Sequence, residues 1–222
     1  MGCNPSAMER EVFNPIHNRR EAVIPARNEE STISQVVKGA LCSVDRVIVV
    51  DDGSKDNTKA IAEAAGAYVI RNEKSRGWLK CLEAGVNASK GDIIVFLDGD
   101  GEHDPTDIPA MVAPIESDIA DMTFGDPGIP VRWSEGVLCW LARLRLPIHN
   151  SGFGYRAIRR DLAENLPFRG KCGCGLMALD ANKLVAPLFE VKVHWRAVEK
   201  QRRTAWFHLI QFWWILRGLA GL

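Results

Sequence analysis

Short apolar runs alternate with helical patterns over the first 120 residues, which predicts parallel strands joined by crossover helices. The predicted strands are 22–25, 47–50, 67–70 and 92–98. A helix after the first strand places apolar residues at 33, 36, 37, 40 and 41 on one face. Further helices are predicted over 61–65, with Asp56 as the N-cap, and around 82–86. We therefore expect an α/β fold with a mostly parallel sheet, flanking helices and a nucleotide-binding type of first half.

Beyond residue 120 the alternation of short apolar runs with helical patterns is less regular. A strand is predicted over 120–124, and 187–195 alternates as a half-buried strand. Between them, 133–146 reads as a helix with Val137, Trp140, Leu141 and Leu144 on one face. Neither a linker-like stretch nor an internal repeat divides the chain, so one domain is the simplest organisation, over 20–203, after an N-terminal extension over 1–19.

Residues 204–222 are mostly apolar and predict a C-terminal amphipathic helix. Its polar stripe consists of Lys200, Thr204, His208 and Gln211, and the tryptophans Trp206, Trp213 and Trp214 belong to the apolar remainder. Because tryptophan favours membrane interfaces, we interpret this helix as interfacial, lying on a membrane surface. The alternatives are a helix packed on the core or on a second subunit of a homo- or hetero-oligomer, and a truncated membrane span.

Charge and cysteine content limit the function classes. Lysine plus arginine and aspartate plus glutamate each number 28, so whole-chain electrostatic attraction to nucleic acid is excluded. Residues 151–222 hold 12 basic and 5 acidic side chains, so an acidic half able to bind a metal precedes a basic half able to bind phosphates. Six scattered cysteines without a CxxC motif and an N-terminus without an apolar run indicate reduced thiols and a cytoplasmic setting.

The candidate chemistry lies where the predicted strands end. In open α/β sheets ligands bind at the carboxyl ends of the strands, and here those ends present residues 27–29, 51–54 and 98–102. Asp98 and Asp100 are two positions apart, so their side chains can share a cation, for which carboxylate oxygens indicate Mg²⁺ or Mn²⁺. The alternative for this segment is a solvated acidic loop. The sequence contains neither a P-loop, a GxSxG elbow nor an HExxH motif.

Four ordered segments carry a family resemblance: VIPARNEE at 23–30, VVDDGSKDNT at 49–58, AG at 84–85 before KGD at 90–92, and LDGDGEHDP at 97–105. Together they resemble the family 2 glycosyltransferases of the GT-A fold, and most closely their dolichyl-phosphate mannosyltransferase-like branch. That branch moves a sugar from a nucleotide-sugar to polyprenyl phosphate. The weaker segment 150–161 resembles the D-x-x-S-G-F-R motif near the family's acceptor site.

The resemblance implies a role for each matching position. Nucleotide-sugar contacts are implied at Pro25, Arg27, Glu29, Val50, Asp52, Asp98, Gly99, Asp100, Arg202 and Arg203. The metal ligands implied are Asp98, Asp100 and Glu102. Besides Asp98 and Asp100, the implied catalytic positions are Asn150 and Arg156. Since Glu29 and Asp52 follow buried strands, we expect both to serve the ligand crevice more than the core.

Five positions depart from the family pattern: Arg27, Trp78 and Leu79 in place of Lys-Gly, Asn150 in place of aspartate and Phe153 in place of serine. An amide cannot act as a general base, but a phosphate acceptor arrives as an oxyanion and hardly needs one. We therefore expect an inverting, metal-dependent enzyme that uses a lipid-phosphate acceptor, peripheral on the cytoplasmic face of a membrane. The alternatives are a non-catalytic nucleotide-sugar-binding or partner subunit and, less favoured, a nucleotidyltransferase, whose glycine-rich loop the segment 25–30 lacks.

Overall fold

The computed structural model describes residues 18–128, 133–170, 173, 175–196, 198 and 207–219, and side chains at 133–135 and 207–209 are not described. Seven strands form one sheet in the order β3-β2-β1-β4-β6-β5-β7. The strands are β1 (Arg20–Ala26), β2 (Arg46–Asp51), β3 (Tyr68–Arg71), β4 (Ile93–Phe96), β5 (Met122–Asp126), β6 (Arg156–Arg159) and β7 (Leu188–Lys192). Only β6 runs against its neighbours, because β4 and β5 both pair with it antiparallel. The mostly parallel α/β sheet is confirmed.

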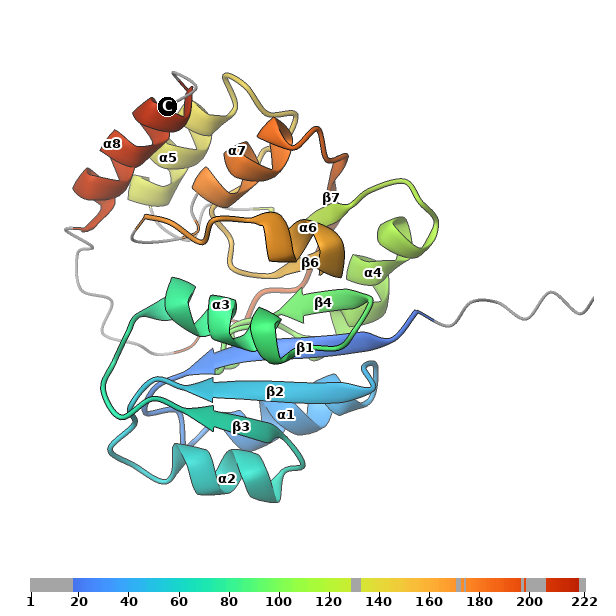
Figure 1. Cartoon of the computed structure of the whole chain (residues 1–222), viewed down its shortest axis with the longest axis vertical. Helices are drawn as coiled ribbons and strands as arrows, with labels where there is room; N and C mark the ends of the chain where they lie inside the picture. The colour runs from blue at the N-terminus through green and yellow to red at the C-terminus, as the bar shows by residue number, and fades with distance from the viewer. Residues whose placement is uncertain are drawn as a thin grey trace, which may run out of the picture.

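The helices cover both faces of this sheet (Figure 1). They are α1 (Ile33–Leu41), α2 (Thr58–Ala64), α3 (Trp78–Ala88), α4 (Ile108–Glu116), α5 (Trp133–Ala142), α6 (Arg160–Asn165), α7 (Leu176–Lys183) and α8 (Phe207–Leu219), with a short 3-10 helix at Pro105–Asp107. The helices α5, α7 and α8 gather at one end of the molecule, away from β3 (Figure 1).

Strand residues alternate between two hydrophobic clusters, one on each face of the sheet. Val23 packs with α3 and the C-terminal helices, whereas Ala22 and Ile24 pack with α1 and α4. This two-sided burial explains why the parallel strands read as continuous apolar runs in the sequence. At Gly85 of α3 an added Cβ would lie 2.2 Å from Val23 Cγ1, so this glycine lets α3 lie close against β1.

The second half differs from the sequence prediction at two helices. The segment 133–146 is helical only over Trp133–Ala142, and Val137, Trp140 and Leu144 are exposed while Leu141 is buried. In α8 the polar residue Gln211 is fully buried, although the sequence pattern placed it on a polar stripe. The other members of that stripe lie outside the described side chains. Both helices thus turn large apolar side chains outward.

Candidate active site

A cavity of about 380 Å³ opens at the carboxyl ends of β1, β2 and β4. Its described lining residues come from three strand ends and from the connection into α3: Pro25, Ala26, Arg27, Glu29, Asp52, Ser75, Gly77, Trp78, Cys81, Asp98, Gly99 and Asp100. Seven of the residues predicted to bind nucleotide-sugar are therefore brought together here. Val50 is not among the lining residues, because it is fully buried in the hydrophobic cluster beneath the sheet. Arg202 and Arg203 lie outside the described residues.

The loops that follow β1 and β2 are joined by hydrogen bonds. The backbone N–H of Asn28 donates to Ser54 Oγ at 3.0 Å, and that of Glu29 donates to Thr58 Oγ1 at 2.8 Å. In return Lys55 N–H donates to Asn28 Oδ1 at 2.8 Å. Ser54 and Thr58, to which the sequence analysis assigned no role, thus position the loop that carries Arg27 and Glu29.

The Asp52 carboxylate organises the loop between β3 and α3. Its Oδ1 accepts from Arg76 N–H at 2.7 Å and Asn72 Nδ2 at 3.0 Å, and its Oδ2 accepts from Ser75 Oγ at 2.6 Å and Gly77 N–H at 3.0 Å. Burial alone raises the pKa of Asp52, but these hydrogen bonds outweigh it and hold the pKa well below its usual range. Four donors match the usual capacity of a carboxylate. Asp52 therefore has a structural task besides any contact with a ligand.

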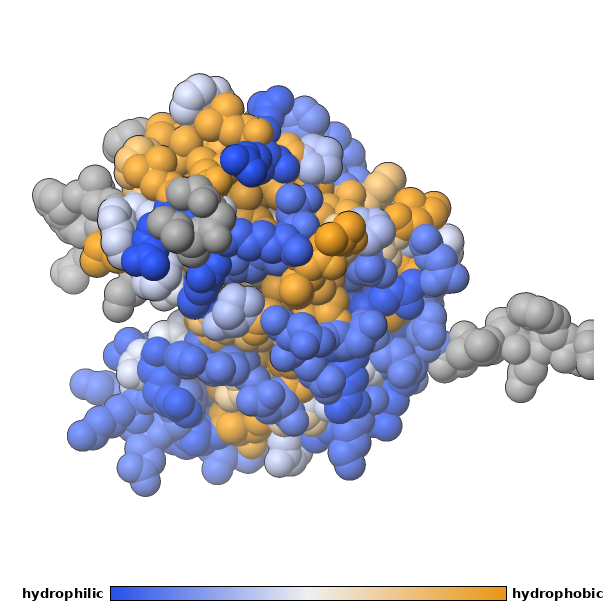
Figure 2. Space-filling view, turned by 45° about the horizontal axis from the view of Figure 1, so that its top comes forward, coloured by the Kyte–Doolittle hydropathy of each residue, from blue (hydrophilic) through white to orange (hydrophobic). Residues whose placement is uncertain are grey.

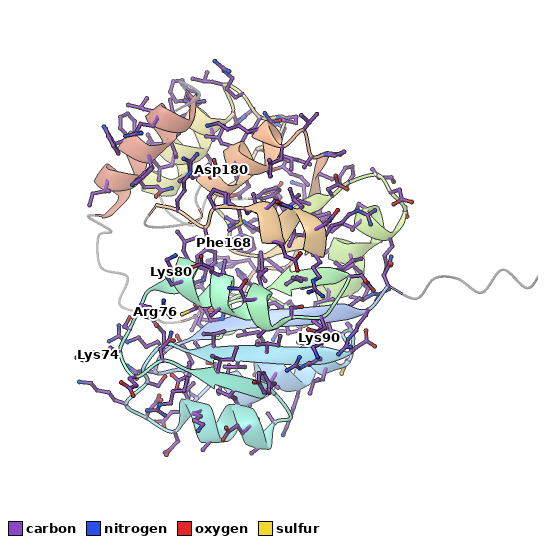
Figure 3. The ribbon with its side chains drawn as sticks, viewed as in Figure 1. Lys74, Arg76, Lys80, Lys90, Phe168 and Asp180 are labelled. Carbon is purple, nitrogen blue, oxygen red and sulfur yellow. The ribbon has the colours of Figure 1, made fainter. Side chains whose placement is uncertain are left out.

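The same loop brings cations to the carboxyl-end edge of the sheet. Lys74 and Arg76 lie on the β3–α3 connection and Lys80 on the first turn of α3, whereas Lys90 lies at the opposite end of the sheet (Figure 3). At Gly53 the backbone has φ of 74° and an added Cβ would lie 3.2 Å from Ser75 N, so a glycine is needed for this loop to approach.

Asp98 is held by two aromatic neighbours. The indole Nε1–H of Trp78 donates to Asp98 Oδ1 at 2.8 Å. The backbone N–H of Asp98 donates to His103 Nδ1 at 3.0 Å, and His103 Nε2 lies 3.8 Å from Asp98 Oδ2. Burial lowers the pKa of His103, so the ring is neutral, with its proton on Nε2. His103 is thus a site residue that the sequence analysis missed, and Trp78, noted there only as a departure from the family pattern, has a defined contact with Asp98.

Asp100 lines the cavity, but Glu102 does not. The backbone N–H of Glu102 donates to Asp100 Oδ1 at 3.0 Å. Within the described part of the chain, no three histidine, cysteine, aspartate or glutamate side chains form a group able to hold a metal. The predicted ligands Asp98, Asp100 and Glu102 therefore do not form a preassembled three-ligand site. Two carboxylates at a strand end still fit Mg²⁺ or Mn²⁺, because Mg²⁺ is usually held by one or two carboxylates, substrate phosphates and water.

Cys81, the only cysteine among the described lining residues, has an unreactive thiol. Burial, and then the charge of Asp52, raises the pKa of its thiol to about 12. A protonated thiol is neither a nucleophile nor a metal ligand. The chemistry of the cavity therefore depends on its carboxylates and hydrogen-bond donors.

Residues 21–181 match the protein family described as Glycosyl transferase family 2. The chain belongs to this family. Because the match spans β2 to β6, most of β1, the cavity and the acidic strand end, the order of motifs and the observed fold agree with it.

Similar proteins of this family include polyprenyl-phosphate enzymes. An uncharacterised protein of Methanocaldococcus jannaschii is 41% identical over 114 residues, which are 47% of this chain and 50% of that protein. A dodecaprenyl-phosphate galacturonate synthase of Rhizobium johnstonii is 31% identical over 115 residues, 46% of this chain and 34% of that enzyme. The matches thus span half or less of these two relatives.

A solved structure shares the fold over most of the chain. Glucosyl-3-phosphoglycerate synthase from Mycobacterium tuberculosis, in complex with Mn²⁺, UDP-glucose and phosphoglyceric acid, has a TM-score of 0.74 at 23% identity. The likeness covers 92% of this chain and 79% of that enzyme. At this identity the comparison establishes the GT-A type of fold alone.

The two remaining predicted site residues do not line the cavity, although the guanidinium of Arg156 lies 5.8 Å from the ring centre of Trp78, which does. Arg156 of β6 is fully buried, and its guanidinium donates to the carbonyl oxygens of Ser151 at 3.2 Å and Gly173 at 3.1 Å. These hydrogen bonds connect β6 to the backbone at Ser151 and Gly173. Asn150 lies at the ends of β5 and β7, where its N–H donates to Glu190 Oε1 at 2.6 Å and its side-chain amide lies 3.5 Å from Asp126 Oδ1.

Replacing Trp78 with phenylalanine is expected to lower the turnover of sugar transfer by about 10-fold. The change keeps the ring but removes the N–H donor to Asp98, and a hydrogen bond to a charged group contributes about 1.5–3 kcal/mol. Steady-state kinetics with separate kcat and KM for the donor checks this, with Tyr68→Phe, which removes a polar group from an exposed aromatic ring outside the cavity, as the matched control. Equal turnover of Trp78→Phe and the parent protein would contradict a positioning role for the indole.

Proposed function

We propose that this chain is a metal-dependent glycosyltransferase that moves a sugar from a nucleotide-diphospho-sugar to a polyprenyl phosphate. The observation that carries the proposal is the single cavity in which Asp98 and Asp100 meet the loops after β1 and β2. Family membership supports sugar transfer, and the dodecaprenyl-phosphate relative supports a lipid-phosphate acceptor. An acceptor of this kind places the enzyme at the periphery of a membrane, on its cytoplasmic face.

In this proposal Asp100, together with Asp98, holds the divalent cation. A bound Mg²⁺ or Mn²⁺ supplies positive charge that stabilises the leaving diphosphate. The donor set fits, since both carboxylates line the cavity and carboxylate oxygens are preferred ligands of these ions. The Mn²⁺-containing glucosyl-3-phosphoglycerate synthase complex supports the choice of metal.

The chain's own residues bind the donor and orient it. The loop at Pro25, Arg27 and Glu29 contacts the nucleoside, while Asp52 holds the facing loop at Ser75 and Gly77 in place. Trp78 and His103 fix the orientation of Asp98 beside the diphosphate. The acceptor phosphate attacks as an oxyanion in a single inverting displacement, so no residue has to remove a proton from it.

Transfer assays with radiolabelled GDP- and UDP-sugars, Mn²⁺ and a polyprenyl phosphate test this function directly. We expect one donor to label the lipid in a reaction that excess EDTA stops. Absence of lipid labelling with every donor, in protein that binds nucleotide, would refute the proposal. It would favour the second candidate, a nucleotide-sugar-binding or partner subunit without catalysis, which the unusual residues Trp78, Asn150 and Phe153 motivate.

Exchanging Asn150 for aspartate separates these two candidates. If the acceptor is a phosphate oxyanion, the rate of transfer changes less than about twofold, because no base is needed. The side-chain amide lies beside Asp126, which pairs with Lys192, so an added carboxylate alters local charge without entering the cavity. Measuring kcat for the variant against the parent decides the question. A gain of more than 10-fold would contradict the oxyanion mechanism and indicate a lost base.

A further inference from the structure

The outward sides of α5 and α8 form an exposed apolar surface at one end of the molecule, which we call the α5–α8 face. The two helices pack against each other, and Figure 2 shows apolar side chains gathered at the end that carries them. Its members have between 41% and 63% of their area exposed: Val137, Trp140, Leu144, Ile210, Phe212, Trp213 and Leu216. A surface of this size and composition on a single chain marks a binding site.

Small residues mark where α5 and α8 come close to α7. An added Cβ at Gly218 of α8 would lie 3.4 Å from Leu176 and Leu179 of α7. One at Gly175 would lie 3.1 Å from both Ala142 and Ile215. Ala142 and Gly218 therefore permit close packing next to the larger buried residues Leu138 and Ile215, while Trp140 and Trp213 are left without cover from the described residues of this chain.

The segments that carry the exposed apolar side chains of this face hold basic and no acidic residues, although α5 also contains Glu135 in its first turn. Residues 136–146 and 210–219 contain three arginines and no acidic residue. Arg143 and Arg145 are exposed directly after α5, and the guanidinium of Arg217 lies 4.8 Å from the ring centre of Trp213. Tryptophan with arginine alongside suits the boundary between acyl chains and anionic headgroups, where the ring lies in the interface and the cation reaches the phosphates.

We propose that the α5–α8 face docks on the surface of an anionic lipid bilayer. A second copy of the chain fits this face less well, because a two-fold interface pairs the same patch with itself and brings its arginines together. Within the described residues no helix is long and apolar enough to cross a membrane, so the contact is interfacial. The inference rests on the proposed function only for the identity of the lipid acceptor, since docking itself needs no catalysis.

The face and the active-site cavity share a neighbouring segment. Gly170 and Gly175 lie against Gln211 and Ile215 of α8, whereas Gly173 lies against Trp78, which lines the cavity. Gln211 and Ile215 lie on the buried side of α8, so the contacts of these glycines run from a cavity residue to the inner side of the helix whose outer side carries the docking face.

Point variants test the proposal without disturbing the core. Because Ile215 is fully buried in the main hydrophobic cluster, removing the helix would expose that cluster, so the exposed Trp140 and Trp213 are the sites to change. We expect the full chain to co-sediment with vesicles of phosphatidylcholine and phosphatidylglycerol. The double variant Trp140→Gln/Trp213→Gln should lower partitioning by at least about 10-fold. Arg143→Gln and Arg217→Gln should each lower it about fivefold, on anionic vesicles only.

Matched controls separate docking from folding and from catalysis. Ile119→Gln/Leu184→Gln removes exposed apolar side chains elsewhere and should leave partitioning unchanged, with all variants melting within about 2 °C of the parent. With a water-soluble short-chain isoprenyl phosphate as acceptor, the tryptophan variant should keep the parent rate. Vesicle binding without any sugar transfer would overturn the proposed function and leave the docking face standing.

Two results would overturn the docking proposal. The first is equal vesicle partitioning of the tryptophan variant and the parent. The second is a parent protein that does not bind vesicles but sediments as a dimer in sedimentation velocity, while the tryptophan variant sediments as a monomer. That result would assign the face to a contact between subunits.

Discussion

Replacing Asp100 with alanine is expected to lower metal-dependent sugar transfer by about 100-fold or more while the protein stays folded. Asp100 follows β4 and lines the cavity, where its carboxylate is one of two able to hold a divalent cation. Loss of a ligand removes charge stabilisation of the leaving diphosphate, and single groups of this kind commonly contribute about 3–4 kcal/mol to the transition state. The side chain belongs to neither hydrophobic cluster, so we expect little change in melting temperature.

The measurement compares the rate of transfer with the affinity for metal. Titrating the nucleoside diphosphate calorimetrically with and without Mn²⁺ should show metal-enhanced binding in the parent and none in Asp100→Ala. Glu102→Gln is the matched control, because Glu102 is two residues away and does not line the cavity. We expect Glu102→Gln to lower the rate of sugar transfer by less than about fivefold. Full activity of the parent in excess EDTA, or equal losses in the two variants, would refute Asp100 as the decisive ligand.

The first half of the fold could be predicted because the pattern of apolar residues in the sequence follows the burial of each strand and helix face in the structure. Strands such as β2 are buried on both faces, so their residues are apolar almost without interruption, and the helix α1 repeats its apolar residues at helical spacing. The carboxyl ends of parallel strands meet at one edge of the sheet, so the sequence alone could place Asp52, Asp98 and Asp100 together.

The second half could be predicted only in part, because periodicity indicated β5, β7, α5 and α8 but not the other elements. The strand β6 has four residues and contains a fully buried arginine, and α4 contains Pro109 and Pro114, so neither shows an ordinary strand or helix pattern. Helices α5 and α8 are apolar on most sides, and small residues such as Ala142 and Gly218 permit their close contact with α7. Sequence spacing alone therefore pointed to the wrong inward face of α5.

In the site, the contacts that sequence reasoning missed join positions far apart in the chain. Trp78 and Asp98 are 20 residues apart, and nothing in a motif indicates that an indole donates to that carboxylate. Val50 matched a binding position but is core, because successive residues of a buried strand point to opposite faces and neither face is solvent. Arg156 matched a catalytic position, yet its donors are directed to backbone carbonyls.

Replacing Asp52 with alanine is expected to weaken nucleotide binding and also to lower the melting temperature by about 6–12 °C. The sequence predicted a ligand residue of little structural weight, but Asp52 is only 6% exposed and its carboxylate accepts four hydrogen bonds. Without it, the backbone N–H groups of Arg76 and Gly77 lose their partner. Such losses cost about 3 kcal/mol in a domain of this size, for which 1 kcal/mol corresponds to about 2–4 °C.

The dependence of this loss on pH identifies its cause. Because the folded state holds the pKa of Asp52 below its usual range, the carboxylate stabilises the fold fully above about pH 4 and progressively less as the pH falls below that value. The difference in melting temperature between parent and Asp52→Ala should therefore be constant from pH 7 to pH 5 and shrink towards pH 3. Glu29→Ala removes an acidic side chain from the same cavity and should weaken nucleotide binding with little change in melting temperature. If Asp52→Ala melted at the same temperature as the parent at pH 7, the loop at Ser75–Gly77 would hold its conformation without this carboxylate. The shape of the pocket would then depend on the hydrogen bonds of Ser54 and Thr58 instead.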